Sequence, residues 1–234
     1  MFDPKVIYET GDFLAVNKPA GLLVHGVKGK EARERTLVDW LVESYPQVQT
    51  VGDDPEQRPG LVHRLDKETS GVLVIAKTQL AFEYLKSLFQ DRRIKKTYLA
   101  LVRGRVEPVR GKIEKPIGIK AGTTKRSVHS SKFSKEAVTE YTVKTQLKGA
   151  ALLDVHPLTG RTHQIRVHLA SIGHPVLGDS VYGGRAAKKL DMGAPRLMLH
   201  AYSIEFQDPK GHSIKIEAEP PEEFSSFVHS LDRA

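Results

Sequence analysis

The sequence contains no cysteine among its 234 residues. This absence excludes disulfides, thiolate catalysis, iron–sulfur clusters and thiolate-bound zinc, and it fits a reducing cytoplasm. No stretch approaches the roughly 18 consecutive apolar residues that a membrane-spanning helix requires. The sequence also lacks a P-loop and a glycine-rich dinucleotide loop, so we expect no nucleotide cofactor. These absences favour a cytoplasmic protein with no membrane partner.

Positive charge is what the sequence has in excess. Lysine and arginine number 36 against 28 acidic residues, which gives a formal net charge of +8. Such a balance favours a polyanionic partner, most often nucleic acid, although it also suits a protein that is merely basic. Hydrophobic residues make up 39% of the chain, enough for a sizeable core.

The periodicity of apolar residues predicts many strands with a few helices between them. The expected strands cover 6–16 with a turn at 11–12, then 72–76, 97–102, 138–145, 150–156, 197–206 and 213–217. The expected helices cover 37–44, 78–93, 162–172 and 222–231. Because strands and helices do not alternate regularly, we predict an α+β fold with a mixed, mostly antiparallel central sheet. No linker separates two domains, so a single domain over 1–234 is expected.

Asp66 lies between an extended run, 61–65, and a turn that leads to the buried strand 72–76. A carboxylate at such a junction can be held rigidly at the end of a sheet. Arg64 places a positive charge beside it. An aspartate before Thr, Ser and Gly also commonly bonds its own backbone in a turn, so the residues alone leave both interpretations open.

A second polar group lies at 158–168. On the predicted helix, His163 and Arg166 are three residues apart and share a face. Arg161 lies just before the helix, near backbone N–H groups that favour anions. The opposite face, expected to be buried, consists of Ile165, Leu169 and Ile172. With Gln164 included, this segment is either a binding face or an ordinary surface helix.

The segment Arg110–Lys135 carries eight cations and one acid, Glu114. A run of this kind is usually a solvated loop, and contact with RNA phosphates is the alternative.

Five segments in order resemble the RluA family of pseudouridine synthases. They are Asn17–Leu22, His63–Gly71, Lys96–Tyr98, Gly160–His168 with Gly173–Asp179, and Pro195–Ala201. The similarity covers nearly the whole chain, and five ordered segments are far more specific than the four residues His63–Asp66 alone.

The resemblance implies roles for individual residues. Asp66 would be the catalytic aspartate, Tyr98 would stack on the target base, and Arg166 would form a salt bridge with the catalytic carboxylate. Arg64 would enter the space left by the flipped nucleotide, and Leu197 or Leu199, expected on one strand face, would back the pocket. The further residues expected to contact substrate or RNA are Lys18, Arg161, His163 and Gln164.

The resemblance also implies the pseudouridine synthase catalytic fold and its reaction. A uridine in structured rRNA or tRNA would be isomerised by breaking the N1–C1′ bond and bonding C5 to C1′, without a cofactor. Many relatives carry an N-terminal S4 module, whereas here the catalytic pattern begins within the first twenty residues. We therefore expect no N-terminal S4 domain in 1–234, and a monomer.

Three other functions remain to be weighed. One is a non-catalytic RNA-binding or chaperone protein on the same fold. A hydrolytic glycosidase or nuclease would generally need a second carboxylate, for which Asp154 and Asp179 are candidates. A histidine-based metal site lacks the usual pattern, because His163 and His168 are five residues apart and no His-Glu-x-x-His occurs. We expect no metal.

Overall fold

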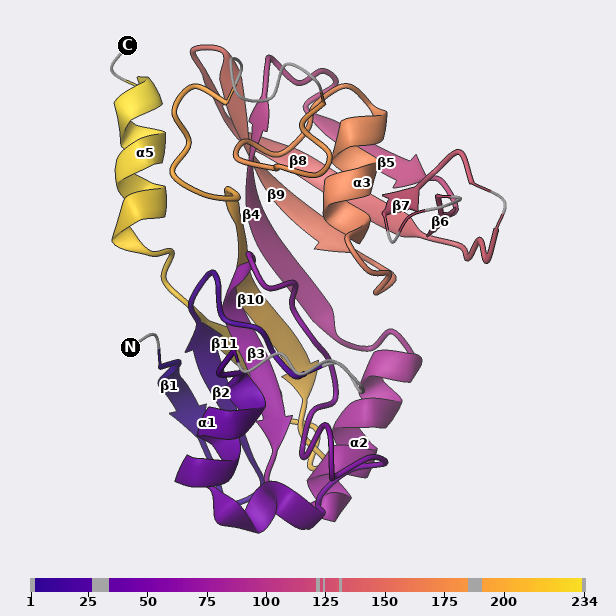
Figure 1. Cartoon of the computed structure of the whole chain (residues 1–234), viewed down its shortest axis with the longest axis vertical. Coiled ribbons are helices and arrows are strands. Elements are labelled where there is room, and N and C mark those ends of the chain that lie inside the picture. Colours follow the sequence, from indigo (N-terminus) through magenta and orange to yellow (C-terminus); the bar gives the residue numbers. More distant parts are fainter. Residues whose placement is uncertain are drawn as a thin grey trace. The chain divides into compact units, whose positions relative to one another are not determined.

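The computed structural model describes residues 3–26, 34–120, 123, 125–130, 132–184 and 191–232. The chain forms two compact units. The first comprises Met1–Lys95 and Ala201–Glu219, and the second comprises Lys96–His200 and Pro220–Ala234. The fold is α+β with a mixed, mostly antiparallel sheet, which confirms the predicted class (Figure 1). Within the described ranges, no helix has the length and apolarity to cross a membrane.

The sheet of the first unit has the strand order β1-β2-β3-β10-β11. Its strands are β1 (Lys5–Glu9), β2 (Phe13–Lys18), β3 (Ser70–Ala76), β10 (Leu199–Gln207, in this unit from Ala201) and β11 (Ser213–Glu217). The pairs β1–β2, β2–β3 and β10–β11 are antiparallel. All seven residues of β3 are buried, as its continuous apolar run predicts for a central strand.

Two α-helices and a short 3-10 helix complete this unit. They are α1 (Leu37–Ser44), η1 (Pro46–Thr50) and α2 (Gln79–Gln90). Thr36 and Asp39 form a reciprocal capping box at the start of α1, and Thr78 caps α2. The apolar face of α2 packs into a core with the sheet, in which Phe82, Leu85 and Leu88 are buried beside residues such as Val74 and Phe206.

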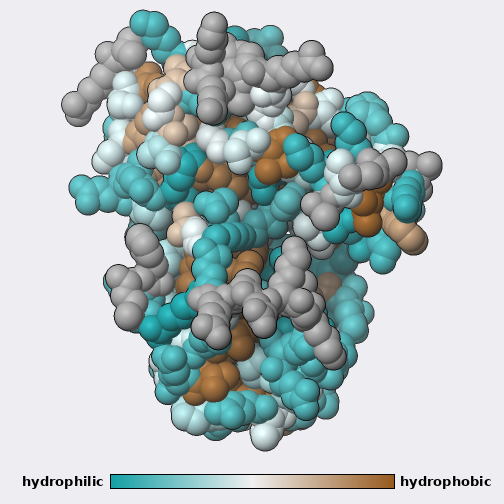
Figure 2. Space-filling view, in the orientation of Figure 1, coloured by the Kyte–Doolittle hydropathy of each residue, from teal (hydrophilic) through white to brown (hydrophobic). Residues whose placement is uncertain are grey.

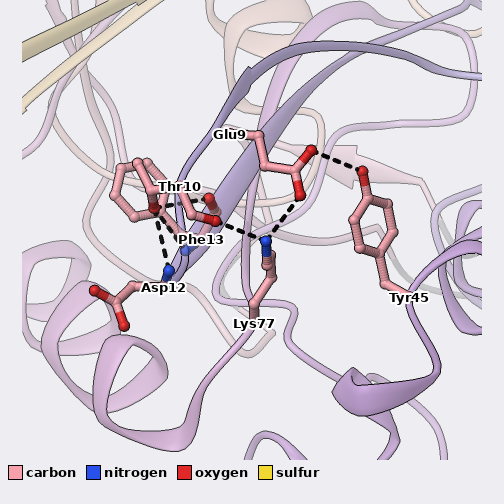
Figure 3. A network of polar contacts seen from close by, with 6 residues as sticks. All are labelled: Glu9, Thr10, Asp12, Phe13, Tyr45 and Lys77. Atoms are coloured by element: carbon pink, nitrogen blue, oxygen red, sulfur yellow. Dashed lines mark hydrogen bonds and ion pairs between the residues drawn. The ribbon is translucent and has the colours of Figure 1, made fainter.

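A polar network ties the turn between β1 and β2 to the end of α1 and the end of β3 (Figure 3). Thr10 closes the turn, since its Oγ1 accepts a hydrogen bond from the N–H of Phe13 at 3.1 Å. The Lys77 ammonium donates to the Glu9 carboxylate at 2.8 Å and to the Thr10 carbonyl at 2.6 Å. The Tyr45 hydroxyl donates to the other Glu9 oxygen at 3.1 Å. These contacts fix the turn at the edge of the sheet.

The second unit contains an antiparallel ladder in the order β4-β9-β8-β5. Its strands are β4 (Lys95–Arg103, in this unit from Lys96), β5 (Arg110–Glu114), β8 (Val138–Leu147) and β9 (Ala150–Pro157). A small hairpin pairs β6 (Gly118–Ile119) with β7 (Arg126–Ser127). The helices are α3 (Gln164–Ser171), beside β8 and β9 in Figure 1, and α5 (Glu222–Asp232).

One expectation about local structure is wrong, and one extended run proves irregular. The segment 110–135 is not simply a solvated loop, because β5 joins the main ladder and β6 pairs with β7. Ile113 and Ile117 are buried there, which anchors an otherwise cationic segment. The run 61–65 forms no regular strand, and its only ladder contact among the described residues is a bridge between Leu61 and Ile75.

Candidate active site

The turn that carries Asp66 is fixed by backbone hydrogen bonds in the first unit. The N–H of Thr69 donates to the Asp66 carbonyl at 3.1 Å, which closes the turn. The next carbonyl, that of Lys67, accepts from the N–H of Gly21 at 2.9 Å and from the ammonium of Lys18 at 3.0 Å. The turn is therefore tied to the corner that follows β2, and Asp66 itself is half-buried.

Lys18 is fully buried, and its ammonium also donates to the carbonyls of Pro19 and Leu22, each at 2.8 Å. A buried ammonium is tolerated where carbonyl oxygens replace its water shell. Lys18 thereby braces both the corner after β2 and the turn after Asp66. These contacts give it a positioning role, and its expected contact with RNA stays a prediction.

His63, three residues before Asp66, is held by contacts with β3 and α2. The Nε2 atom of His63 accepts a hydrogen bond from the N–H of Val74 at 2.9 Å, so this nitrogen carries no proton. The His63 ring also stacks on Phe89 of α2, with ring centroids 4.6 Å apart. Arg64 is exposed beside His63, and its Nη1 lies 3.5 Å from Nε2 of His25. Burial lowers the pKa of His25, and the charge of Arg64 lowers it further.

In the second unit, the helix α3 is more deeply buried than the sequence suggests. It begins after His163, whose φ is 58°, and every residue from Gln164 to Leu169 is buried. The expected separation into an exposed polar face and a buried apolar face is therefore wrong for these six residues. The physical reason is that their polar side chains have partners inside the protein, so burial leaves few bonds unmade.

Gln164 links the start of α3 to β8. Its Oε1 accepts from the hydroxyl of Thr159 at 2.7 Å and from the N–H of Arg161 at 3.0 Å. Its amide nitrogen donates to the Val138 carbonyl at 2.9 Å and to the Thr139 hydroxyl at 3.0 Å. The side chain thus positions α3, and its predicted contact with RNA remains untested. The guanidinium of Arg161 donates through Nε to a backbone carbonyl at 2.9 Å.

Arg166 forms a buried, bidentate ion pair with Asp179. The two bonds join Nε to Oδ2 at 2.7 Å and Nη2 to Oδ1 at 2.9 Å. Oδ1 of Asp179 also accepts from the N–H groups of Val181 and Tyr182, both at 2.9 Å. Burial by itself raises the pKa of Asp179, but the bonds and charge of Arg166 and the two N–H groups outweigh it and lower the pKa. The carboxylate is therefore ionised and locks the guanidinium in place.

Tyr182 connects this ion pair to the basic segment. Its ring lies under the Arg166 guanidinium, whose central carbon is 5.2 Å from the ring centroid. Its hydroxyl lies 2.8 Å from Nδ1 of His163 and accepts from the N–H of Arg126 at 3.0 Å. The sequence did not point to Tyr182 as a site residue. Its one signal was its position three residues after Asp179, because an aspartate can accept a hydrogen bond from a backbone N–H at that spacing.

His168 is a packing residue. It is fully buried, its Nδ1 accepts from the Thr139 hydroxyl and its Nε2 donates to the Lys115 carbonyl, each at 2.9 Å. Burial lowers its pKa. Across the described part of the chain, no cluster of three or more His, Asp or Glu side chains is arranged to hold a metal ion.

The remaining predicted site residues lie on or beside the strands β4 and β10 in the second unit. Tyr98, on β4, is half-buried and opposite Val155 of β9. Leu197 and Leu199 are both buried. Leu199 is the first residue of β10 and Leu197 precedes the strand, so only one of them lies on the strand that was expected to carry both.

The predicted residues thus form two groups. Lys18, Arg64 and Asp66 belong to the first unit. The second unit contains Tyr98, Arg161, His163, Gln164, Arg166, Leu197 and Leu199. That the two groups meet in one pocket stays a prediction. Both candidates for a second carboxylate have cationic partners, because Asp179 pairs with Arg166 and Asp154 with Lys144 at 3.2 Å.

Comparison with known proteins identifies the family. A family model described as RNA pseudouridylate synthase matches residues 12–171. A protein of Aquifex aeolicus named as an uncharacterized RNA pseudouridine synthase is 43% identical and aligns with 97% of this chain and 72% of its own length. The ribosomal large subunit pseudouridine synthase D of Borreliella burgdorferi is 36% identical, with coverages of 97% and 68%.

The fold agrees with these sequence matches. The structure of human RNA pseudouridylate synthase domain containing 1 superposes with a TM-score of 0.76 at 28% identity, covering 99% of this chain and 87% of that one. Human RNA pseudouridylate synthase domain containing 4 gives a TM-score of 0.75 at 27% identity. The matched segment contains both the Asp66 turn and Arg166. The resemblance to the RluA family is confirmed, and this chain belongs to the RNA pseudouridylate synthase family.

Proposed function

We propose that this chain converts specific uridines of structured RNA to pseudouridine, with Asp66 as the catalytic carboxylate. The observation that carries the proposal is the Asp66 turn itself, which is fixed on both sides by contacts from β2, β3 and α2. An ordinary surface turn needs no buried lysine beneath it. Catalysis by a single carboxylate does need a rigid support, because the oxygen must stay within reach of the ribose.

The reaction begins with access to the base. A uridine in folded RNA must leave its stack, which costs a few kcal/mol. Stacking of the extruded uracil on Tyr98 returns about 1–3 kcal/mol of this. The exposed Arg64 fills the space that the base leaves, and Leu197 or Leu199 contributes apolar packing behind the base.

Asp66 then acts on the ribose, either by bonding to it or by removing a proton from it to give a glycal. In both routes the N1–C1′ bond breaks, the uracil turns, and C5 bonds to C1′. In the first route the bond from Asp66 to C1′ replaces the N1–C1′ bond and breaks when C5 bonds to C1′. In the second route the proton taken from the ribose returns to it in that step. The hydrogen on C5 leaves as a proton and N1 gains one, so atoms and electrons balance without a cofactor. Arg166 is assigned to pair with the Asp66 carboxylate, and its bonds to Asp179 fix the plane of its guanidinium.

Ribosomal RNA is the first substrate to test, because relatives such as the Borreliella protein are named as large-subunit enzymes. Transfer RNA is the second. We place the protein in the cytoplasm as a monomer with RNA as its partner. A contact with RNA through Lys18, Arg161, His163 and Gln164 is part of the proposal, most directly for Arg161 and His163, which are half-buried.

The decisive variant is Asp66→Asn, which keeps the shape of the side chain and removes its charge. We expect tritium release from [5-³H]uridine-labelled rRNA and tRNA transcripts to fall at least about 100-fold, since a positioned catalytic group contributes about 10²–10⁴. RNA affinity should stay within about threefold, because the substitution removes no cation that could contact phosphate. Asp154→Asn, another half-buried carboxylate, is the matched control.

Two results would contradict the proposal. Undiminished tritium release by the Asp66→Asn variant would remove Asp66 from the chemistry. Tight RNA binding by the wild type without tritium release from either RNA would support the non-catalytic alternative. Release of free uracil or cleavage of the strand would instead indicate a hydrolase.

A further inference from the structure

Phe133 is an unusually placed aromatic side chain. Its exposed fraction is 72%, and its φ of 51° lies in the left-handed region that only glycine adopts freely. Among the described residues, the other large apolar side chains that are exposed have no aromatic ring: Leu80, Val109, Leu158 and Met192. A strained backbone that presents an apolar ring to solvent does not help the chain to fold, and such features concentrate at functional sites.

The turn that carries Phe133 is firmly held. Ile117 and Lys135 exchange two backbone hydrogen bonds, at 2.9 and 3.1 Å, and the N–H of Ile119 donates to the Lys132 carbonyl at 3.0 Å. Gly118 permits this close approach, because a Cβ there would lie 2.5 Å from the Ser130 carbonyl oxygen. The ring is therefore presented by a folded turn with a fixed base.

The segment that carries the ring is cationic. It includes four exposed lysines: Lys120, Lys125, Lys132 and Lys135. The ammonium of Lys132 lies 5.8 Å from the centroid of the Phe133 ring. The sequence has no acidic residue between 115 and 135. In Figure 2, hydrophilic residues surround small hydrophobic patches over the part of the surface that carries β6 and β7.

The same segment is bound to the helix of Arg166. Ile117, Ala137 and Val167 of α3 form a small buried core, against which Tyr182 packs. Tyr182 in turn bonds the N–H of Arg126 and lies beside His163. The residues that hold the segment of the Phe133 turn therefore also position α3.

We infer that Phe133 and its four lysines, hereafter the Phe133 platform, dock an unpaired nucleotide of the RNA substrate. The base stacks on the Phe133 ring while the lysines face the flanking phosphates, which is the combination that binds single-stranded RNA without sequence preference. A second copy of this chain is the less suitable occupant, since it would bring like charges together. The inference rests on the proposed function and deepens it, because it assigns RNA binding to a surface outside the catalytic residues.

The test uses a fluorescein-labelled single-stranded oligouridylate and fluorescence anisotropy. Phe133→Ala should weaken binding by roughly 5- to 100-fold, the effect of losing one stacked base. Phe133→Tyr should bind like the wild type, and Phe133→Leu, which is apolar but not aromatic, should bind like Phe133→Ala. Leu80→Ala removes a comparably exposed apolar side chain from α2 and should change nothing.

Salt dependence separates stacking from charge. Phe133→Ala removes no phosphate contact, so the slope of log affinity against log salt should be unchanged. The double variant Lys132→Ala, Lys135→Ala should lower the magnitude of that slope by roughly one to two units. In a Trp40→Phe background, Phe133→Trp supplies a single tryptophan whose fluorescence should be quenched when the base stacks on it.

The outcomes distinguish this inference from the proposed function. Equal binding by the wild type and Phe133→Ala, or wild-type binding by Phe133→Leu, overturns the stacking platform. The proposed enzymatic activity is then tested separately by tritium release. Weakened binding by Phe133→Ala without tritium release from any RNA supports the platform and contradicts the proposed function. Failure of the wild type to bind the oligouridylate overturns the platform, as does concentration-dependent self-association that Phe133→Ala abolishes.

Discussion

Replacing Asp179 by alanine removes the carboxylate that holds Arg166. The pair is almost completely dry, because the exposed fractions of the two side chains are 6% for Arg166 and 0% for Asp179. The substitution deprives a buried guanidinium of its two bonds to Asp179. It also leaves the N–H groups of Val181 and Tyr182 without the carboxylate oxygen that accepts from them.

The magnitude follows from this geometry. Breaking one side of a buried ion pair costs about 3–5 kcal/mol, much of it from the charge left behind. Two backbone donors without an acceptor place the Asp179→Ala variant in the upper part of that range. For a chain of this size the midpoint of thermal unfolding should fall by about 6–20 °C.

The assay is urea denaturation followed by circular dichroism, with Asp154→Ala as the matched control. Asp154 pairs with Lys144 in the same unit, but the two side chains are 26% and 45% exposed. Its loss should cost less than about 1 kcal/mol. A destabilisation by Asp179→Ala no larger than that of Asp154→Ala would refute the reasoning.

A double variant separates stability from catalysis. Arg166→Met combined with Asp179→Leu replaces the ion pair by apolar side chains of similar volume. The double variant should lose less free energy of unfolding than the two single variants lose together, by up to about 3 kcal/mol. If Arg166 also serves Asp66, this stable variant still binds RNA but releases little tritium. Recovery of activity together with stability would restrict Arg166 to a structural role.

Other substitutions test the packing that supports the site. Because burial lowers the pKa of His168, the unfolded chain takes up a proton that the folded chain does not as pH falls below about 6.5, so the free energy of unfolding should decrease there. His168→Gln should reduce this slope in urea titrations, and a slope unchanged from the wild type would exclude His168 as its source. Gly71→Ala should prevent normal folding, judged by circular dichroism, because its Cβ would lie 2.1 Å from the Ala201 carbonyl oxygen. Lys18→Met should lower turnover more than RNA affinity, since the ammonium braces the turn after Asp66; equal losses would indicate an RNA contact instead.

Elements whose cause is local were predictable from the sequence. The helix Leu37–Ser44 and the strand Ser213–Glu217 have the predicted bounds, because a capping box and an alternating pattern lie within a few residues. The helix α3 was predicted in place but not in environment. Its buried Arg166 depends on Asp179, thirteen residues later, and no local period carries that information.

In the candidate site, too, local sequence patterns did not carry the information about long-range contacts. The resemblance assigned roles to Asp66 and Arg166, whereas the contacts that support these residues join distant segments. Lys18 reaches the Lys67 carbonyl, and His63 accepts from a strand that follows it. Sequence spacing could not show that Lys18 is a buried brace, because that role depends on which carbonyls converge on its ammonium in three dimensions.

Some of the side chains assigned to the proposed reaction are fixed when the chain folds, and others remain exposed and can adjust to the RNA. An arginine loses up to about 2 kcal/mol of rotamer entropy when it is immobilised, and Asp179 imposes that cost during folding and not when RNA binds. The turn after Asp66 is likewise ordered in advance by backbone bonds. Arg64 and Phe133 remain exposed, as suits side chains that must adjust to an RNA surface. Binding energy from the exposed residues is then available to extrude the base, because Arg166 and the backbone of the Asp66 turn need no further ordering.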